Sequence, residues 1–216
     1  MRRFALFDLD DTLIDLRAAF RLWAAEFADG FGLGVDAADW LIALDGEGLA
    51  HRGEFFARVR ERFGLHEDAA ELWAGYRRRM PSLVECAPNV LDGLAALRAL
   101  GWRVGIVTNG TADNQIGKIK CTGLVDVVDG YACSGVEGVR KPDRRLFEIA
   151  ADRCGVSLEG GGWMVGDNLI KDVGGGRGAG LKTAWVNPQG LGSGDTPPDC
   201  VVGHVREALV LLKSLG

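Results

Sequence analysis

Phe4-Ala5-Leu6-Phe7-Asp8-Leu9-Asp10-Asp11-Thr12 stands near the start of the chain, with four apolar residues followed at once by a cluster of acids. A short, uninterrupted apolar run is typical of a strand that is covered on both faces, as in a parallel sheet. Open α/β sheets bind their ligands beyond the carboxyl ends of the strands, which is where these acids stand. The stretch therefore predicts a buried strand over 4–7 and a polar site just after it.

The rest of the chain alternates between strand and helix patterns after one long helical interruption. Residues 15–84 carry only helical patterns, with apolar side chains spaced three or four positions apart. Beyond them, short apolar runs separated by helical segments lie at 104–107, 131–133, 163–165, 183–186 and 200–202. Such alternation predicts βαβ units in a doubly wound parallel sheet. We expect an α/β core made of residues 1–14 and 85–216, with a smaller helical domain inserted at 15–84.

Composition and charge exclude several classes of protein. The 216 residues are 47% hydrophobic and 25% charged, near the averages of globular proteins. The net charge of −5 and the lack of a Lys/Arg block argue against a nucleic-acid partner. No apolar run approaches the ~18 residues of a membrane span. The early acids rule out a signal-peptide core, and five scattered cysteines without a Cys-x-x-Cys pair suit a reducing compartment, so we expect a cytoplasmic protein.

Polar residues follow three of the predicted strands. The acids after the first strand are matched by Thr108-Asn109-Gly110 after the second and by Gly166-Asp167-Asn168 after a later one. Asp172 lies five positions beyond Asp167, and Lys141 precedes a predicted helix. Because parallel strands end at the same edge of a sheet, we expect these groups to converge there.

The residue types at this edge indicate oxygen-ligand chemistry. Asp8 and Asp10 are two positions apart in extended chain, so both carboxylates should face one pocket, where like charges raise one pKa unless a cation is present. Carboxylates without a neighbouring His or Cys suit Mg²⁺ better than zinc or copper. A lysine, a threonine hydroxyl and backbone N–H groups suit the oxygens of a phosphoryl group.

Taken in order, four motifs resemble those of the haloacid dehalogenase superfamily in its phosphatase branch. They are Asp8-Leu9-Asp10-Asp11-Thr12, Thr108-Asn109-Gly110, Lys141-Pro142-Asp143, and Gly166-Asp167-Asn168 with Asp172. The helical insert is similar to the small helical (C1-type) cap of that superfamily. The sequence departs from the family pattern at Arg144, where relatives often have Pro, and in the glycine-rich segment 174–178.

The resemblance implies a Mg²⁺-dependent phosphatase acting on a small phosphorylated metabolite of the sugar phosphate or nucleotide class. Asp8 would be the nucleophile that forms an aspartyl-phosphate, and Asp10 the general acid and base. Lys141 would neutralise charge on Asp8 and the phosphoryl group. The inserted domain would act as a cap over the site, and the protein would be a monomer or a small homo-oligomer.

The same resemblance implies the binding residues. Thr108 and the backbone of Asn109 or Gly110 would donate hydrogen bonds to the phosphoryl group. The implied metal ligands are the Asp8 carboxylate, the Asp10 backbone carbonyl, Asp167, and Asp172 directly or through water.

Four alternatives compete with this hypothesis. A 2-haloacid dehalogenase uses the same aspartate nucleophile but needs neither a leaving-group acid nor a metal. A phosphomutase would depend on a sugar bisphosphate. A signalling receiver domain also uses Asp, Mg²⁺, Thr and Lys, but is far shorter, and a non-catalytic interaction protein would not need all these side chains.

Three further segments carry structural predictions. We expect the glycines of 174–180 to allow close helix–sheet packing, with a helix stop at Gly180, rather than to form a nucleotide-binding loop. The aromatic residues of the insert should form its core; they are Trp23, Trp40, Trp73, Phe55 and Phe56. The loop 45–52, with His51 and Arg52, is a weaker candidate for substrate contact.

Overall fold

The computed structural model of the chain describes residues 3–47, 52–187, 189–194 and 197–215. The chain divides into two compact units: Met1–Asp15 with Glu85–Gly216, and Leu16–Val84. We call the first the core unit and the second the helical unit.

The core unit is built on a six-stranded sheet in the order β3-β2-β1-β4-β5-β6, and every neighbouring pair is parallel. Its strands are β1 (Phe4–Phe7), β2 (Arg103–Thr108), β3 (Gly130–Cys133), β4 (Trp163–Gly166), β5 (Lys182–Val186) and β6 (Cys200–Val202). From β1 the chain builds outward to β3, then returns to the other side of β1 and builds outward to β6. This confirms the predicted doubly wound α/β fold and puts the reversal of strand order between β1 and β4, where such sheets bind ligands.

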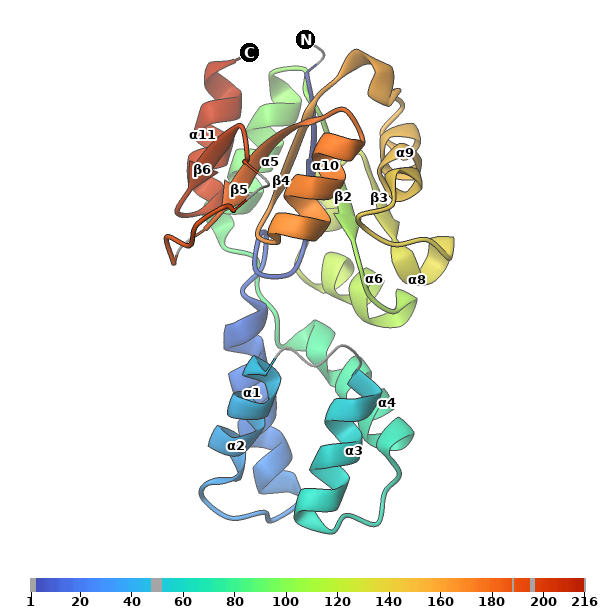
Figure 1. The fold of residues 1–216 in the computed structure, drawn as a ribbon, viewed down its shortest axis with the longest axis vertical. Coiled ribbons are helices and arrows are strands. Elements are labelled where there is room, and N and C mark those ends of the chain that lie inside the picture. Colours follow the sequence, from blue (N-terminus) through green and yellow to red (C-terminus); the bar gives the residue numbers. More distant parts are fainter. Residues whose placement is uncertain (1–2, 48–51, 188, 195–196, 216) are drawn as a thin grey trace. The chain divides into compact units, whose positions relative to one another are not determined.

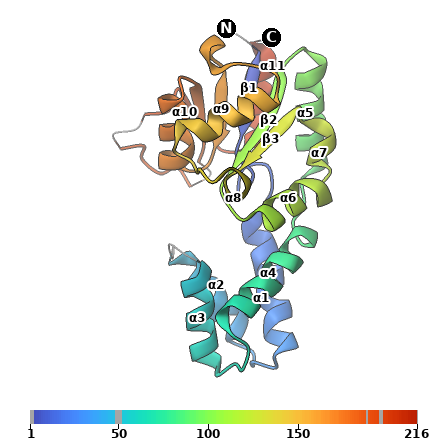
Figure 2. The same ribbon diagram turned by 90° about the vertical axis from the view of Figure 1, so that its right-hand side faces the viewer.

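Helices cover both faces of this sheet. In Figures 1 and 2, α9 and α10 lie on one face, and α5 and α11 on the other. The helices of the core unit are α5 (Pro88–Ala99), α6 (Ala112–Cys121), α7 (Leu124–Val127), α8 (Ser134–Glu137), α9 (Arg144–Arg153), α10 (Gly175–Gly178) and α11 (Val205–Ser214). Two shorter turns are η2 (Leu158–Gly160) and η3 (Leu169–Gly174), the latter a π-helical turn.

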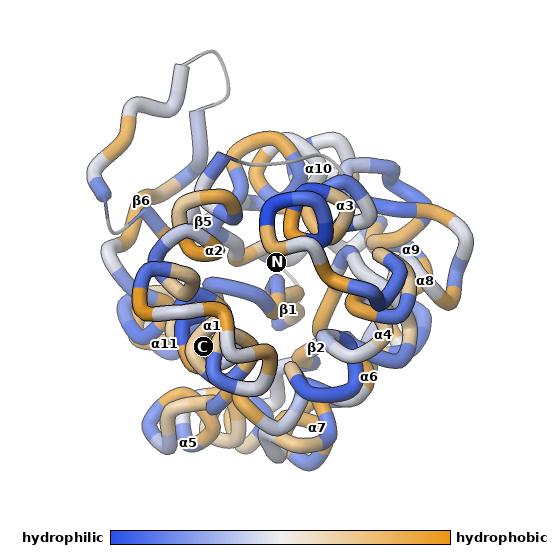
Figure 3. Tube along the Cα trace, turned by 90° about the horizontal axis from the view of Figure 1, so that it is seen from below, coloured by the Kyte–Doolittle hydropathy of each residue, from blue (hydrophilic) through white to orange (hydrophobic). Residues whose placement is uncertain are grey.

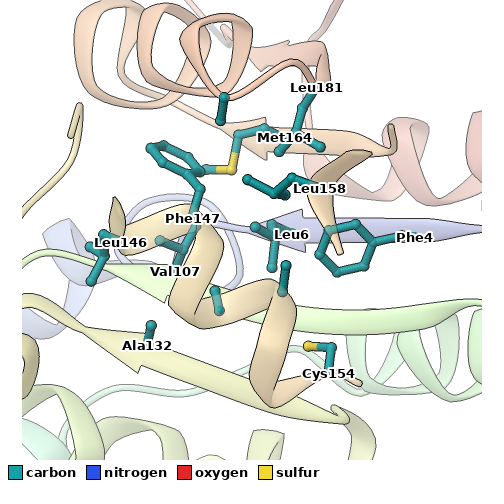
Figure 4. Close-up of a cluster of buried hydrophobic side chains, with 13 residues drawn as sticks. Phe4, Leu6, Val107, Ala132, Leu146, Phe147, Cys154, Leu158, Met164 and Leu181 are labelled. Atoms are coloured by element: carbon teal, nitrogen blue, oxygen red, sulfur yellow. The ribbon is translucent and has the colours of Figure 1, made fainter. Parts of the chain in front are cut away.

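The centre of the core unit is buried because helices cover both faces of its sheet. All four residues of β1 are fully buried. Figure 4 shows Leu146 and Phe147 of α9 over the strand side chains Val107 and Met164. In Figure 3 hydrophilic and hydrophobic stretches alternate around the helices, the pattern of helices with one buried face.

Glycines let α10 approach the sheet closely. A Cβ added at Gly176 would lie 2.7 Å from Met164 Cβ of β4 and 3.2 Å from Thr183 Cγ2 of β5. Gly180, just after the helix, has a φ of +83°, which suits a glycine stop. The predicted close helix–sheet packing is confirmed.

The helical unit contains α1 (Leu16–Gly30), α2 (Ala37–Gly46), α3 (Arg52–Phe63), α4 (Ala69–Arg79) and the turn η1 (Met80–Ser82). Trp23 is the hub of its aromatic core, with ring centroids 4.9 Å from Phe27, 5.0 Å from Tyr76 and 5.8 Å from Phe56. A capping box between Asp68 and Glu71 starts α4 by satisfying two of its free N–H groups.

Two of the predicted core aromatics are only half-buried. Trp40 packs edge-on against Phe63, and the guanidinium of Arg77 lies over the ring of Trp73. Each ring sits near the helix surface, so the aromatic prediction was right for Trp23 and the Phe55–Phe56 pair and wrong for these two.

Arg52 is engaged within its own unit. Its guanidinium lies over the rings of Phe20, Phe55 and Tyr76, and it pairs with Asp45. His51 lies outside the described residues. Of the helices that the structure describes, none combines the length and apolar character needed to span a bilayer.

Candidate active site

The first group of the site is a buried lysine between two aspartates. Asp8 directly follows β1, and its backbone N–H bonds Val165 O, which continues the pairing toward β4. Lys141 Nζ donates to Asp8 Oδ1 at 2.6 Å and to Asp172 Oδ1 at 2.7 Å. The lysine and Asp172 side chains are almost fully buried, and the Asp8 side chain is 12% exposed. Three segments far apart in the sequence therefore meet at the carboxyl end of β1.

Asp167 joins these two carboxylates. One carboxylate oxygen from each of Asp8, Asp167 and Asp172 lies within 4.8 Å of the others, and we call this set the carboxylate cluster. Asp167 follows β4, and its carbonyl accepts a hydrogen bond from Trp185 Nε1 of β5 at 2.8 Å. Asp8 and Asp167, which follow two different strands, are thus brought together with Asp172.

Local backbone geometry holds Asp172 in place. Its Oδ2 accepts the N–H of Asn168 at 2.9 Å, while Asn168 Oδ1 accepts the N–H groups that start η3. A Cβ at Gly166 would lie 2.5 Å from the Asp172 carboxylate. The glycine of Gly166-Asp167-Asn168 is therefore required by the close approach of this acid.

The electrostatics of the cluster show an excess of negative charge. Burial and then the charge of Asp172 raise the pKa of Asp8 well above its usual range, against the opposing effect of Lys141. Burial and the charges of Asp172 and Asp11 raise the pKa of Asp167 to about 7. Burial would lower the pKa of Lys141, but Asp172 and Asp8 outweigh it and raise it. One ammonium group does not balance three carboxylates.

The cluster fits a hard divalent cation. Its donors are all carboxylate oxygens, which Mg²⁺ prefers, and they gather close enough for a single ion to contact more than one. A cation there would offset the charge excess that raises the two carboxyl pKa values.

Asp10 has separate partners. Lys118 Nζ donates to Asp10 Oδ1 at 2.8 Å, and Gln115 Nε2 donates to Asp10 Oδ2 at 2.9 Å. The carboxylate cluster does not include Asp10. Asp8 and Asp10 are therefore held by different lysines, and the expectation that both carboxylates face one pocket stays a prediction. The negative charges that raise the pKa of Asp8, after burial, are those of Asp172 and Asp167.

Gln115 and Lys118 were missed in the sequence because they occur in a helix with mostly polar residues. Both belong to α6, and each is only 1% exposed. The available signal was their spacing: Gln115, Lys118, Ile119 and Thr122 follow the i, i+3, i+4, i+7 pattern of a single helix face. Polar residues on a buried face point to a specific hydrogen-bond network.

The Thr108-Asn109-Gly110 segment is also fixed by hydrogen bonds. Thr108 Oγ1 accepts a hydrogen bond from Gln115 Nε2 at 2.7 Å. Asn109 forms two hydrogen bonds with the backbone of Lys141: its Nδ2 donates to the carbonyl at 3.0 Å, and its Oδ1 accepts from the N–H at 2.9 Å. The Gly110 N–H donates to Ser134 Oγ at 3.0 Å. The Gly110 N–H, one of the two backbone groups expected to bind the phosphoryl group, is therefore already hydrogen-bonded. The other, the N–H of Asn109, stays the predicted donor.

Comparison with known proteins places this architecture in a family. A family model described as haloacid dehalogenase-like hydrolase matches residues 3–180. The chain is 37% identical over 161 residues to the phosphoserine phosphatase of Thermus thermophilus, covering 72% of this chain and 62% of that protein, which is less than two thirds of its length. It is 32% identical over 194 residues to the glyceraldehyde 3-phosphate phosphatase of Pyrococcus abyssi, covering 86% and 81%.

A solved structure shows the same fold over the whole chain. The HAD-hydrolase YfnB of Bacillus subtilis, determined bound to magnesium, superposes with a TM-score of 0.80 at 24% identity, covering 98% of this chain and 99% of that one. The motifs, the sheet order and the family model agree, and the chain belongs to the haloacid dehalogenase-like hydrolases.

Proposed function

We propose that the protein is a Mg²⁺-dependent phosphatase that hydrolyses a small phosphomonoester, of the sugar phosphate or nucleotide class, through an aspartyl-phosphate. The observation that carries this proposal is the Asp8 carboxylate held by Lys141 inside the carboxylate cluster. Support also comes from the two relatives described above, both named as phosphatases of small phosphorylated compounds.

The proposed ligands of the metal are the carboxylates of Asp8 and Asp167 and the backbone carbonyl of Asp10, with Asp172 binding directly or through water. When bound, Mg²⁺ supplies charge neutralisation and orientation for the phosphoryl oxygens. Lys141 adds a fixed positive charge beside Asp8, and Thr108 with the Asn109 N–H would donate hydrogen bonds to the same group.

In the first step, an Asp8 carboxylate oxygen attacks phosphorus and the bond between phosphorus and the ester oxygen breaks. Asp10 gives its proton to the departing alkoxide. In the second step, Asp10 takes a proton from a water molecule whose oxygen attacks phosphorus. The bond between Asp8 and phosphorus breaks, which releases inorganic phosphate and restores both carboxyl groups.

The dehalogenase alternative uses less of this site. Displacement of a halide by Asp8 needs no leaving-group acid, yet Asp10 is held by two dedicated donors. It needs no metal either, yet three carboxylates gather around one ammonium group. The observed arrangement favours phosphoryl transfer.

The first experiment measures hydrolysis of p-nitrophenyl phosphate with Mg²⁺, with EDTA, and by Asp8→Asn. We expect activity that needs Mg²⁺ and falls at least 10³-fold in Asp8→Asn, because the nucleophile is lost. Asp152→Asn, at an exposed position of α9, is the matched control and should keep wild-type activity. Activity that survives in Asp8→Asn contradicts the mechanism, and turnover of 2-chloropropionate in EDTA favours the dehalogenase.

A further inference from the structure

Lys118 is a buried cation that the proposed mechanism does not use. It is 1% exposed and ranks among the largest fully buried side chains of the protein. Removing an ammonium group from water is costly unless it is paired. Among the hydrogen bonds of the described residues, the partner of Lys118 Nζ is Asp10 Oδ1. The burial of this lysine therefore depends on the position of the Asp10 carboxylate.

Gln115 holds the other oxygen of the same carboxylate. Its Nε2 donates to Asp10 Oδ2 and to Thr108 Oγ1, which uses both of its N–H bonds. The carboxylate accepts only, so the amide nitrogen must face it. Because Thr108 Oγ1 accepts a bond from Gln115, its own O–H is left to donate to another group.

Gly110 gives this glutamine its space. A Cβ at Gly110 would lie 2.6 Å from Gln115 Cγ and 2.7 Å from its Cδ. Gly110 therefore has to be a glycine for the Gln115 side chain to pack against the Thr108-Asn109-Gly110 segment. Gln115 and Lys118 lie one helical turn apart, so a single rigid helix delivers both donors.

We infer that Lys118 and Gln115 are positioning residues that fix the Asp10 carboxylate for proton transfer to the leaving group, with Gln115 also orienting the Thr108 hydroxyl. One donor on each oxygen fixes the rotation of the carboxylate and leaves lone pairs for the transferred proton. This inference rests on the proposed phosphatase function. Proton transfer requires hydrogen-bond reach, so a small displacement of Asp10 is costly.

The test uses two aryl esters of similar size that differ in their need for an acid. Phenol, like the tyrosine side chain, has a pKa of about 10 and leaves poorly without protonation, whereas p-nitrophenolate leaves readily. The measured quantity is kcat/KM with saturating Mg²⁺, which reports the steps up to departure of the leaving group. Lys118→Met and Gln115→Leu remove the donors while keeping similar side-chain volume.

We expect each variant to lose roughly tenfold or more kcat/KM on phenyl phosphate beyond its loss on p-nitrophenyl phosphate. Lys120→Met, at an exposed position of the same helix, should leave both values unchanged. In an Asp10→Asn background, adding Lys118→Met should change the ratio of kcat/KM on the two esters by less than about twofold. Lys118 acts through the Asp10 carboxylate, which is already lost, so the two effects are not additive.

If the variants lose kcat/KM equally on both esters, or lose none, the positioning role is wrong. The proposed phosphatase function is not affected by that result, because the wild-type enzyme is active. If the wild-type protein hydrolyses neither ester with Mg²⁺, the proposed function fails and this inference fails with it. Circular dichroism checks the fold of each variant, and if Lys118→Met does not fold, Gln115→Leu decides the outcome.

Discussion

Among the residues that the structure describes, Lys141 is the cation that bonds two members of the carboxylate cluster, and its removal should be costly. In Lys141→Met the buried carboxylates of Asp8 and Asp172 lose their shared partner. Breaking a buried ion pair on one side costs about 3–5 kcal/mol of unfolding free energy, and we expect a loss of that size in EDTA at pH 8. Mg²⁺ should reduce the difference in unfolding free energy between Lys141→Met and the wild type, because the ion replaces part of the missing positive charge.

Urea denaturation with and without MgCl₂ checks this expectation, with Lys120→Met at an exposed position as the control for loss of one lysine. If Lys141→Met matched the wild-type stability in EDTA, the lysine would not be the counter-charge of the cluster. The hydrolytic activity of Lys141→Met should also fall by about 10²-fold or more, because the positive charge beside the nucleophile Asp8 is lost.

At the scale of elements, the fit of α10 against the sheet gives a paired prediction. Gly176→Ala places a Cβ 2.7 Å from Met164 Cβ, which forces the strand or the helix to shift. Overpacking of this kind costs about 1–3 kcal/mol. Gly178→Ala, two positions further along the same helix, meets no atom within 4 Å and should be neutral or stabilising by up to about 1 kcal/mol.

Thermal unfolding of the two alanine variants tests this contrast. Both substitutions are chemically identical and lie in one helix, so a difference between them measures packing and not helix propensity. Equal melting temperatures for Gly176→Ala and Gly178→Ala would mean that α10 does not press against β4 and β5 as the structure shows.

The strand-end motifs could be predicted from the sequence because each is a short apolar run followed by polar residues. Asp8 and Asp167 needed only the rule that parallel strands end at one edge, whereas Lys141, which precedes a helix, was assigned from the family resemblance. The network around Asp10 could not be found this way. Lys118 and Gln115 lie on a helix, and whether a polar helical residue faces solvent or the core depends on how that helix packs.

The separate partners of Asp8 and Asp10 could not be predicted from the sequence either. Two-residue spacing predicts a shared face only while the chain stays extended, but the extended strand ends at Phe7. Asp11 has a φ of +56°, so the backbone turns just beyond Asp10. Two separate lysines, 23 positions apart in the sequence, then hold the two acids.

For the whole molecule, the charge excess of the cluster links stability to pH. Burial and the charges of Asp172 and Asp11 raise the pKa of Asp167 to about 7 in the folded protein, against an ordinary value of 3.8. The folded state therefore binds the proton more tightly than the unfolded chain. The resulting stabilisation is fully present below about pH 4 and is lost as the pH rises through 7.

We therefore expect the metal-free protein to lose stability between pH 5.5 and 8, by an amount on the order of 1 kcal/mol per pH unit near pH 7. Asp167→Asn mimics the protonated form without titrating. In EDTA at pH 8 it should be more stable than wild type, and the difference in stability should shrink to roughly half by pH 5.5 and vanish only near pH 4. Urea denaturation of both proteins across this range measures the difference.

With saturating Mg²⁺ at pH 8, we expect the wild type to be more stable than Asp167→Asn, the reverse of their order in EDTA. Metal ligands bind as carboxylates, so binding displaces protons and its stabilising effect grows as the pH rises through 7. Asp167→Asn loses one of the proposed ligands and should gain less from the ion than the wild type. If wild type and Asp167→Asn kept a constant difference in stability at every pH in EDTA, the raised pKa of Asp167 would be contradicted. If Mg²⁺ stabilised both equally, Asp167 would not be a ligand, and the metal site would have to be sought elsewhere in the carboxylate cluster.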